Sequence, residues 1–451
     1  MERIKKFFKI EERGTTVRTE LIGGLVTFLA MAYILAANPF ILADTLDPMP
    51  VGGVFVATAI SAAIATIVMG LLANYPIALA PGMGINALVA YGVIGTMGYS
   101  WEEAMAAVFI SGIIFLVISL TSVRTQIIRA VPASLKKAIG AGIGFFIAFI
   151  GLKNAGIVVS NPATFVSLGD LSNPTVLLAL FGIVLALVLY AVNHKINKFA
   201  LIIAILITAI VGVSIGLIFK VDGMPAFAGG YNDLSSFGET LFGFTKGLGT
   251  VFGKGDLWFV IFSLLFLDIF DTAGTLISVA EPAGLLDENG EMKDIDKALM
   301  SDAIGTVVGA VVGTSTVTSY IESSAGIESG ARTGLSSVLV GVLFLVSIVA
   351  YPVFSIFITS AALTSMALVL VGVFMMSQLK GIAWDDKPSL AASFITILMM
   401  VLNYSIGNGI AFGFITYVLL MLVQRRHKEV TLTMYILSVA FIAYFVINAV
   451  V

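Results

Sequence analysis

Long apolar runs separated by short polar stretches dominate this chain. Each run is about 20 residues long, the length with which an α-helix crosses a ~30 Å hydrocarbon core. The first set of apolar spans lies at 19–43, 51–73, 77–95, 103–122, 135–157, 173–193 and 199–219. The second set lies near 258–281, 296–313, 316–328, 333–352, 359–378, 388–403 and 405–424. The pattern predicts an all-α polytopic membrane protein, in which the last apolar stretch, 431–451, is a further span or an interfacial helix.

The composition agrees with this prediction. The chain has 451 residues, of which 59% are hydrophobic and only 11% are charged, and its mean hydropathy is +1.06. Soluble domains contain about 25% charged residues. The net charge of −3 gives no reason to expect a nucleic-acid partner. The absence of cysteine excludes a disulfide framework, a zinc–thiolate site and a thiol nucleophile.

Lys and Arg predict the orientation in the membrane. They cluster before the first span, at 124–137, at 195–198 and directly after residue 424. Because basic loops face the cytoplasm, the N-terminus is expected inside and the polar stretch at 220–256 outside a cell membrane. The N-terminal residues 1–18, with Phe7, Phe8 and Ile10 among basic residues, are expected to form a short interfacial amphipathic helix.

The two sets of spans resemble each other. SAAIATIV at 61–68 matches SDAIGTVV at 301–308 with an ungapped offset of 240, and GIIFLV at 112–117 resembles GVLFLV at 341–346. Seven is an odd number of spans, so the second set runs opposite to the first. Inverted repeats place a substrate near the midplane, between interrupted helices.

Two spans carry the expected interruptions. Two prolines and two glycines between Pro76 and Gly84 prevent a regular helical start to the third span. The Thr- and Ser-rich run at 314–326 favours an extended strand followed by a helix start at Ser323. At the offset of 240, Gly82 falls opposite Glu322, so the two helix starts are expected to face one pocket.

Four carboxylates are embedded in the spans, and no Lys or Arg accompanies them: Asp268, Asp271, Asp302 and Glu322. A charge at a helix centre costs roughly 2.5–3.5 kcal/mol on insertion scales, so each requires a reason. Asp268 and Asp271 share one helix face. We expect Asp271 and Glu322 to bind a substrate; a structural or capping role is the alternative. Asp268 is equally balanced between the two roles, and Asp302 is expected to support the site.

A cluster of unpaired carboxylates cannot ionise completely, and this favours proton coupling. Sodium is the alternative coupling ion, because carboxylates, hydroxyls and free carbonyls also bind it. The ligand that fits such a site is a cation or a neutral, planar heterocycle with N–H donors. The aromatic surface against which such a ring would stack could be supplied by Tyr320, Phe270, Phe28 or Tyr33.

Three strings together resemble the AzgA-like family of hypoxanthine/guanine/adenine permeases, in the nucleobase–ascorbate transporter superfamily. They are FLDIFDTAGTL at 266–276, APGMGINA at 80–87 and TSTVTSYIESSAG at 314–326. The resemblance implies about 14 transmembrane segments in two inverted repeats of seven, with short strands in segments 3 and 10. It also implies elevator-like, proton-coupled purine uptake, no enzymatic activity, no cofactor or metal, and a homodimer in lipid.

The resemblance also implies roles for individual residues. The substrate-binding residues would be Asp271, Glu322, Asn86, Thr275, Tyr320 and Gly82, and the coupling or supporting residues Asp268 and Asp302. Thr275 stands where uracil-transporting relatives have histidine, so a proton would have to pass through the carboxylates.

The implied division of the chain is a cytoplasmic N-terminus, a core, a gate, an extracellular loop, a second part of the core, a second part of the gate, and a basic turn with a C-terminal hydrophobic helix. Their ranges are 1–18, 19–122, 123–219, 220–257, 258–352, 353–424 and 425–451.

Other functions remain open on the same fold. A transporter of xanthine or uracil is one, and an anion exchanger or channel is another. The acidic cluster argues against anions, because anion sites depend on cationic groups or helix dipoles. An intramembrane enzyme would need a nucleophile–base pair or a metal triad, and the sequence offers neither.

Overall fold

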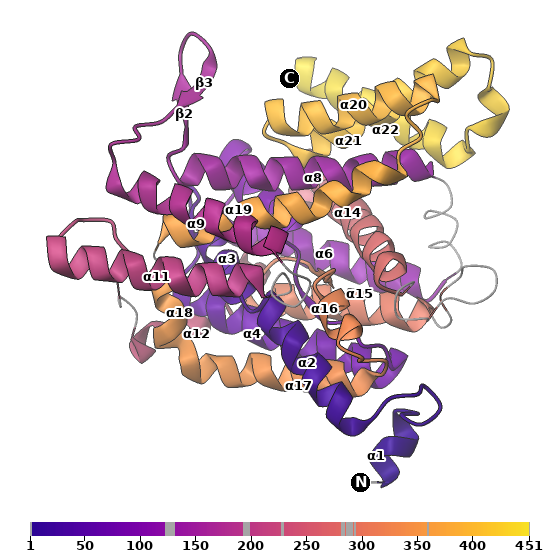
Figure 1. Ribbon diagram of the computed structural model, residues 1–451. Coiled ribbons are helices and arrows are strands. Elements are labelled where there is room, and N and C mark those ends of the chain that lie inside the picture. Colours follow the sequence, from indigo (N-terminus) through magenta and orange to yellow (C-terminus); the bar gives the residue numbers. More distant parts are fainter. Residues whose placement is uncertain are drawn as a thin grey trace. The chain divides into compact units, whose positions relative to one another are not determined.

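The computed structural model describes residues 2–121, 131–192, 199–226, 230–280, 285, 292, 295–358 and 360–450 (Figure 1). Residues 124–130 of the basic cluster at 124–137 lie outside the described residues, as do all of 195–198 and the side chain of Phe270. The described chain forms two compact units. Unit 1 contains Met1–Leu120 and Gly151–Ala367, and unit 2 contains Thr121–Ile150 and Leu368–Val451.

Both units are built almost entirely from helices. Those of unit 1 are α1 (Glu2–Phe7), α2 (Val17–Met31), α3 (Ile34–Ala43), α4 (Val51–Val68), η1 (Met69–Ala73), α5 (Met83–Ala87), η2 (Leu88–Thr96), α6 (Trp101–Ser119), α9 (Pro174–Val192), α11 (Ala200–Phe219), η3 (Tyr231–Ser236), α12 (Phe237–Thr240), α13 (Phe244–Gly253), α14 (Gly255–Ala280), α15 (Ile295–Val312), α16 (Ser323–Glu328), α17 (Gly334–Ser347), η4 (Ile348–Ala350) and α18 (Tyr351–Ile358). Those of unit 2 are η5 (Met376–Gly381), α20 (Lys387–Leu402), α21 (Ile406–Val423), η6 (His427–Glu429) and α22 (Leu432–Val450). The boundaries between the units fall inside α8 (Ala133–Asn154) and α19 (Ala361–Met375).

The helices are those of a multi-pass membrane protein. Among the described residues, 10 helices are long and apolar enough to cross a bilayer, and three shorter apolar helices cover Met83–Thr96, Lys387–Leu402 and Leu432–Ala443. The last of these belongs to the stretch for which the sequence left a span or an interfacial helix open. The helical class predicted from the sequence is therefore confirmed.

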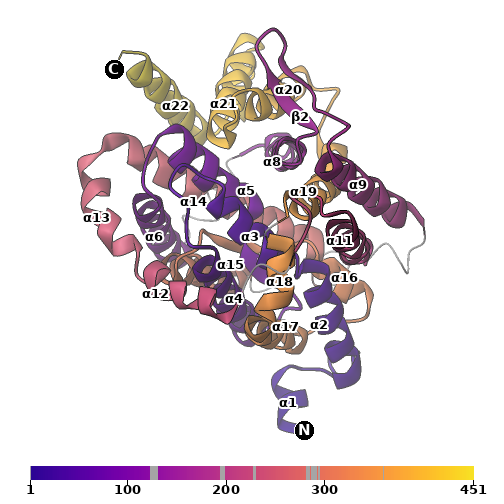
Figure 2. The same ribbon diagram turned by 90° about the vertical axis from the view of Figure 1, so that its left-hand side faces the viewer.

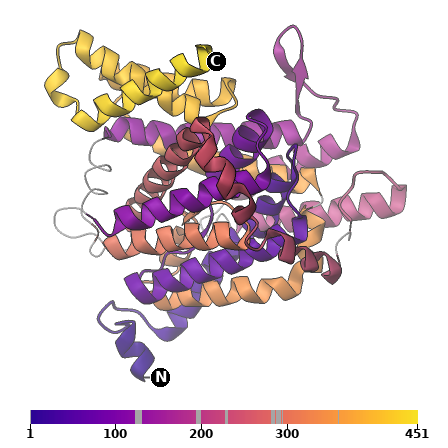
Figure 3. The same ribbon diagram turned by 180° about the vertical axis from the view of Figure 1, so that it is seen from behind.

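Four helices of unit 1 form a layer in which the two halves of the chain alternate. The packed pairs are α6 with α15, α15 with α4, and α4 with α17, and Figure 3 shows them side by side in this order. The outer members, α6 and α17, contain the matching strings at 112–117 and 341–346, and the inner members, α15 and α4, contain those at 301–308 and 61–68. The order of the layer is therefore symmetric: the two outer helices match each other in sequence, and so do the two inner helices.

A two-stranded sheet joins the two interrupted spans. β1 (Leu79–Pro81) and β4 (Val317–Ser319) are antiparallel, and Ala80 lies opposite Thr318. The strand predicted within 314–326 is thus present, and the irregular start of the third span is its partner. A second hairpin, β2 (Val158–Asn161) with β3 (Phe165–Leu168), follows α8 and was not predicted from the sequence.

The polar stretch at 220–256, expected as a loop, also contains helices. η3, α12 and α13 lie within it, and α13 packs along α6 (Figure 2). The reason is local amphipathicity: Phe244 and Val251, two turns apart, are buried, and Gly247 between them lies so close to α6 that a Cβ atom would meet Glu102 O at 2.4 Å.

The N-terminal segment is docked on the protein. Phe8 and Ile10, expected to face lipid headgroups, are only 6% and 1% exposed, whereas Phe7 remains exposed. Arg13 Nη1 donates to the carbonyl oxygens of Asn74, at 2.6 Å, and Arg332, at 2.8 Å. This arginine therefore ties together the turns that precede β1 and α17.

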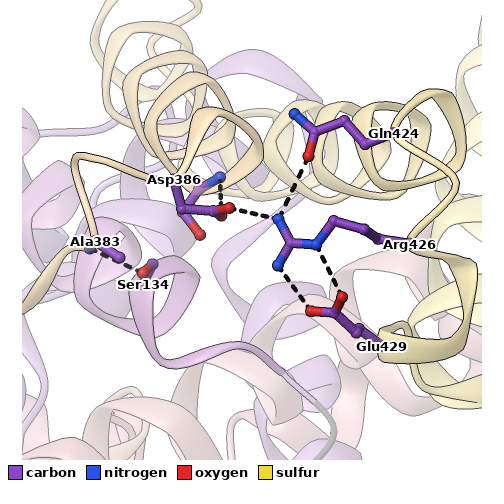
Figure 4. Close-up of polar contacts among 7 residues, drawn as sticks. Ser134, Ala383, Asp386, Gln424, Arg426 and Glu429 are labelled. Carbon is purple, nitrogen blue, oxygen red and sulfur yellow. Dashed lines mark hydrogen bonds and ion pairs between the residues drawn. The ribbon is translucent and has the colours of Figure 1, made fainter.

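In unit 2, Arg426 connects the start of α20 with the turn before α22 (Figure 4). Its Nη1 donates to Asp386 Oδ1 at 2.5 Å, and its Nε and Nη2 donate to the two carboxylate oxygens of Glu429 at 2.9 and 2.7 Å. Partial burial acts to raise the pKa of Asp386, but hydrogen bonds from Ser389 and Arg426 outweigh it and leave that pKa below its ordinary value. The bond from Arg426 also lowers the pKa of Glu429.

Candidate functional site

The small sheet of β1 and β4 is the scaffold of the candidate site in unit 1. Gly82 N donates to Thr316 O at 2.9 Å and Tyr320 N donates to Ala78 O at 2.9 Å, so the pairing extends past both strand ends. α5 begins directly after Gly82 and α16 directly after Glu322. The sequence prediction that these two residues occupy matching helix starts is confirmed. Non-helical backbone of this kind is stable at membrane depth only where it is enclosed by protein or lines a cavity.

The two aspartates of α14 point toward β4 and α15. Asp268 is fully buried, and its Oδ2 accepts a 2.8 Å hydrogen bond from the Thr306 hydroxyl. Asp271, one turn later, is half-buried and interacts with Thr318 of β4. The i, i+3 spacing read from the sequence therefore brings both carboxylates to the face of α14 that meets the sheet.

Glu322 completes the acidic group from the other interrupted span. It is half-buried, and its Oε1 accepts a 2.7 Å hydrogen bond from the Tyr33 hydroxyl. It makes no side-chain cap to α16, so the capping role that was the alternative is not what this structure shows. Glu322 and Asp271 interact electrostatically across the site. Two half-buried carboxylates from different elements thus lie near each other.

Asp302 lies behind Asp268 on α15. It is fully buried and interacts electrostatically with Asp268 and Asp271. Neither of its carboxylate oxygens has a hydrogen-bond partner of good geometry within the described chain. In the same part of the chain, no Lys or Arg forms a salt bridge with any of the four embedded carboxylates.

Tyr320 and Gly82 hold the sheet together. The Tyr320 hydroxyl donates to Pro81 O at 2.5 Å, which ties β4 to β1. A Cβ atom on Gly82 would lie 2.9 Å from Thr318 Oγ1, so glycine permits the close packing of Gly82 against that threonine. In this structure both residues shape the site through the backbone. Thr275 is half-buried on α14, one turn beyond Asp271.

Asn86 lies among buried hydroxyl groups at the other end of β4. It is fully buried, and its Oδ1 accepts a hydrogen bond from the Ser315 hydroxyl. Its Nδ2 has no hydrogen-bond partner within the described residues. The structure therefore shows an available amide donor here, but shows no contact between Asn86 and the carboxylates.

Tyr33 is the residue whose role the sequence did not reveal. It lies where α2 ends and α3 begins, and it was considered only as an aromatic face. Its ring, together with Phe28, lines an apolar cavity of about 180 Å³ that also touches α11 and α18. Tyr33 thus has an apolar cavity on its ring and a carboxylate on its hydroxyl. The sequence around Tyr33 contains no pattern from which its hydrogen bond to Glu322 could have been predicted.

The site favours ligands that donate hydrogen bonds. It offers carboxylate oxygens, hydroxyls and one amide N–H₂, and none of the described residues beside it is basic. Among the described residues, no group of three or more His, Cys, Asp or Glu side chains is arranged to hold a metal ion. A neutral or cationic solute with several N–H groups fits this chemistry better than an anion.

Comparison with known proteins adds independent information. A family model described as a permease family matches residues 18–406. The chain is 43% identical to guanine/hypoxanthine permease PbuG of Bacillus subtilis, over 98% of this chain and 99% of the relative. It is 39% identical to adenine permease AdeQ of Escherichia coli, over 97% of this chain and 95% of the relative.

Solved structures share the fold at low sequence identity. The transmembrane domain of BicA, a cyanobacterial bicarbonate transporter, matches with a TM-score of 0.60 at 15% identity, over 88% of this chain and 97% of that one. SLC26A9 also matches with a TM-score of 0.60, at 12% identity, over 90% of this chain and 66% of that one. At these identities the likeness concerns the fold alone.

Proposed function

The chain belongs to the permease family, and on that premise we propose that it takes up purine nucleobases across the cell membrane. The observation that carries the proposal is the likeness to PbuG and AdeQ, which are named as purine permeases and match nearly from end to end. The acidic site agrees with it, because adenine, guanine and hypoxanthine are planar and carry several N–H donors.

Asp271 and Glu322 are the proposed base-binding groups. Both are half-buried, so their oxygens can accept N–H donors from a ligand in the plane of its ring. A hydrogen bond to a charged group contributes about 1.5–3 kcal/mol. Phe28 and Tyr33, which line the adjoining cavity, provide apolar surface for the ring. Asn86, Tyr320, Gly82 and Thr275 complete the proposed binding region.

We propose the proton as the coupling ion, with Asp268 and Asp302 as the groups that carry it. Both are fully buried, and no basic side chain neutralises them within the described chain. A buried carboxylate without a cation is far more stable with a proton bound. Sodium is the competing ion, and an uptake measurement separates the two.

The proposed movement is an elevator-like exchange between a core of segments 1–4 and 8–11 and a gate of segments 5–7 and 12–14. The mirrored order of the four-helix layer supports two inverted repeats of seven segments. A cytoplasmic N-terminus and a homodimer belong to the same proposal. Anion exchange, which the bicarbonate-transporter fold allows, is disfavoured by the cation-free acidic site.

Uptake of radiolabelled bases tests the proposal. Cells that lack their own permeases would express this chain and receive adenine, guanine, hypoxanthine, xanthine or uracil, with and without a protonophore or sodium. We expect saturable purine uptake that the protonophore abolishes. Uptake restricted to xanthine or uracil would replace the substrate, and uptake that depends on sodium alone would replace the coupling ion.

Site variants locate the activity. Asp271→Asn and Glu322→Gln should each abolish uptake at a normal level of protein in the membrane. Asp44→Asn is the matched control, because the Asp44 carboxylate accepts hydrogen bonds from Tyr91, at 3.0 Å, and Asn154, at 3.2 Å, which are not among the proposed site residues. Full activity in Asp271→Asn or Glu322→Gln would remove that residue from the site.

A further inference from the structure

Two threonines hold the two strands of the small sheet in the same way. Thr66 of α4 and Thr306 of α15 are 240 positions apart (306 − 66), the offset at which the two halves of the chain match. The Thr66 hydroxyl lies 2.9 Å from both the N and the O of Leu79, the first residue of β1. The Thr306 hydroxyl lies 3.3 Å from both the N and the O of Val317, the first residue of β4. Each hydroxyl therefore accepts from one backbone N–H and faces the carbonyl of the same residue.

The two threonines differ in one neighbour. Thr306 Oγ1 also lies 2.8 Å from Asp268 Oδ2, whereas no carboxylate contacts the Thr66 hydroxyl within the described chain. A hydroxyl has a single hydrogen to donate. Thr306 must therefore donate either to Asp268 or to the strand. Its distances to the strand N and O are both 0.4 Å longer than those of Thr66 (3.3 against 2.9), so the Thr306 hydroxyl lies nearer to Asp268, at 2.8 Å, than to the strand.

The surroundings of Asp268 contain few other charges. Asp271 on the same helix and Asp302 on α15 are its ionisable neighbours. The elements that pack most extensively on α14 are α15, α6, β4, α5 and α13. α5, β4 and residues 104–119 of α6 contain no charged residue. α13 contains Lys246, which forms a salt bridge with Glu102 at the start of α6, and α15 also contains Asp296 and Lys297 in its first turn. The charge next to Thr306 therefore changes when this group of carboxylates binds or releases a proton.

We propose that Thr306 is a positioning residue that transmits the protonation state of Asp268 to strand β4. This role rests on the proposed proton-coupled transport. When Asp268 is ionised, the Thr306 hydrogen is donated to its carboxylate, and the Val317 carbonyl lacks that donor. When Asp268 binds a proton, the Thr306 hydroxyl rotates and donates to Val317 O, as Thr66 does to Leu79 O. β4 is then held as tightly as β1.

The strand connects this change to the binding groups. Thr318, the next residue of β4, interacts with Asp271, and Tyr320 ties the end of the strand to Pro81. Glu322 follows two residues later. Gain or loss of the hydrogen bond to the Val317 carbonyl would therefore shift the positions of Asp271 and Glu322 relative to the bound base. Thr66, which lacks a carboxylate neighbour, gives β1 no comparable sensitivity.

Three variants separate coupling from structural support. Thr306→Val removes the hydroxyl with little change of shape, Thr306→Ser keeps it, and Thr66→Val removes the matching hydroxyl of the other strand. Purine accumulation against a gradient and exchange of labelled for unlabelled purine would be measured in proteoliposomes with an imposed pH gradient. We expect Thr306→Val to exchange purine at a reduced rate but to lose accumulation, with a ratio falling to about one. Thr306→Ser should accumulate as the unmodified protein does, and Thr66→Val should lose rate while its accumulation ratio keeps its response to pH.

Two results would contradict this role. One is accumulation with the usual pH response in Thr306→Val, and the other is equal loss of coupling in Thr66→Val. Absence of purine transport by the unmodified protein would instead overturn the proposed function, and this role with it.

A measurement on the unmodified protein does not depend on how the variants fold. Amide hydrogen exchange, corrected for the intrinsic effect of pH, would be followed in peptides that contain β1 and β4. We expect exchange of the β4 peptide to slow on acidification, while that of the β1 peptide does not change. The same response in both peptides would refute the role of Thr306.

Discussion

Replacing Tyr33 with phenylalanine removes one oxygen atom, which donates the 2.7 Å hydrogen bond to Glu322 Oε1. The ring remains to line the apolar cavity, so the packing between α2, α3 and their neighbours should be preserved. Glu322 would lose the donor that fixes the orientation of its carboxylate. A hydrogen bond to a charged group contributes about 1.5–3 kcal/mol. Since about 1.4 kcal/mol is a factor of ten in an equilibrium constant, we expect apparent purine affinity to fall by roughly 10- to 150-fold.

Initial rates of labelled purine uptake over a range of concentrations would measure this effect, with protein in the membrane quantified by immunoblot. Tyr91→Phe is the matched control, because the Tyr91 hydroxyl also donates to a carboxylate, that of Asp44, at 3.0 Å. The control should transport with an affinity within a few-fold of the unmodified protein. Unchanged KM and kcat in Tyr33→Phe would show that the hydrogen bond to Glu322 does not position the binding group.

Two further changes test other parts of the structure. Gly82→Ala places a Cβ atom 2.9 Å from the nearest side-chain atom of β4, and overpacking of this kind costs about 1–3 kcal/mol; we expect weaker uptake and a lower Tm, and an unchanged Tm and uptake rate would contradict the tight fit. Arg426 helps to lower the pKa of Asp386 and lowers that of Glu429. At pH values above the ordinary carboxyl pKa of about 4, the two ionised carboxylates therefore stabilise the contact between the start of α20 and the turn before α22. Their contribution is lost as pH falls through the lowered pKa values. Hydrogen exchange around the turn before α22, corrected for pH, should therefore increase below about pH 4, and Arg426→Gln should show faster exchange at neutral pH with a smaller response to acid. An identical acid response in the variant would refute this explanation.

The sequence predicted the helical membrane class because runs of apolar residues have a length that only a bilayer explains. It also located the two interruptions, since proline and glycine before residue 84 and β-branched residues after 314 are incompatible with regular helix. The offset of 240 placed Gly82 and Glu322 at equivalent helix starts, and the structure confirms that placement.

Side-chain partners could not be predicted in the same way. Tyr33 and Glu322 are 289 residues apart, and nothing in the local pattern of either connects them. Thr66 and Thr306 did carry a signal, since they are one of the two pairs of hydroxyl residues that the strings at 61–68 and 301–308 share, the other being Ser61 and Ser301. Their bonds to the strands, however, depend on packing between helices that sequence spacing alone does not specify.

Glu20 is a buried carboxylate that the sequence did not identify. It stands at the start of the first span, where a glutamate would ordinarily be solvated, and it was not counted among the embedded carboxylates. In the structure it is fully buried and accepts hydrogen bonds from Arg332 N, at 2.8 Å, and Thr333 N, at 3.2 Å. Its position near a predicted membrane boundary concealed this contact with a turn more than 300 residues later.

The pairing of β1 with β4 has a consequence for the order in which the protein can be made. Leu79 lies opposite Ser319, so a ribosome must add 240 residues (319 − 79) after the first strand before its partner exists. During that time the backbone of β1 has no ladder to satisfy it, and exposure of free N–H and C=O groups to lipid costs several kcal/mol each. Thr66, which emerges earlier and bonds both groups of Leu79, can protect part of the strand meanwhile. The part of the chain that contains β1 is therefore expected to stay shielded by the insertion machinery until β4 arrives, and chains truncated before residue 317 should be recognised as incomplete by membrane quality control.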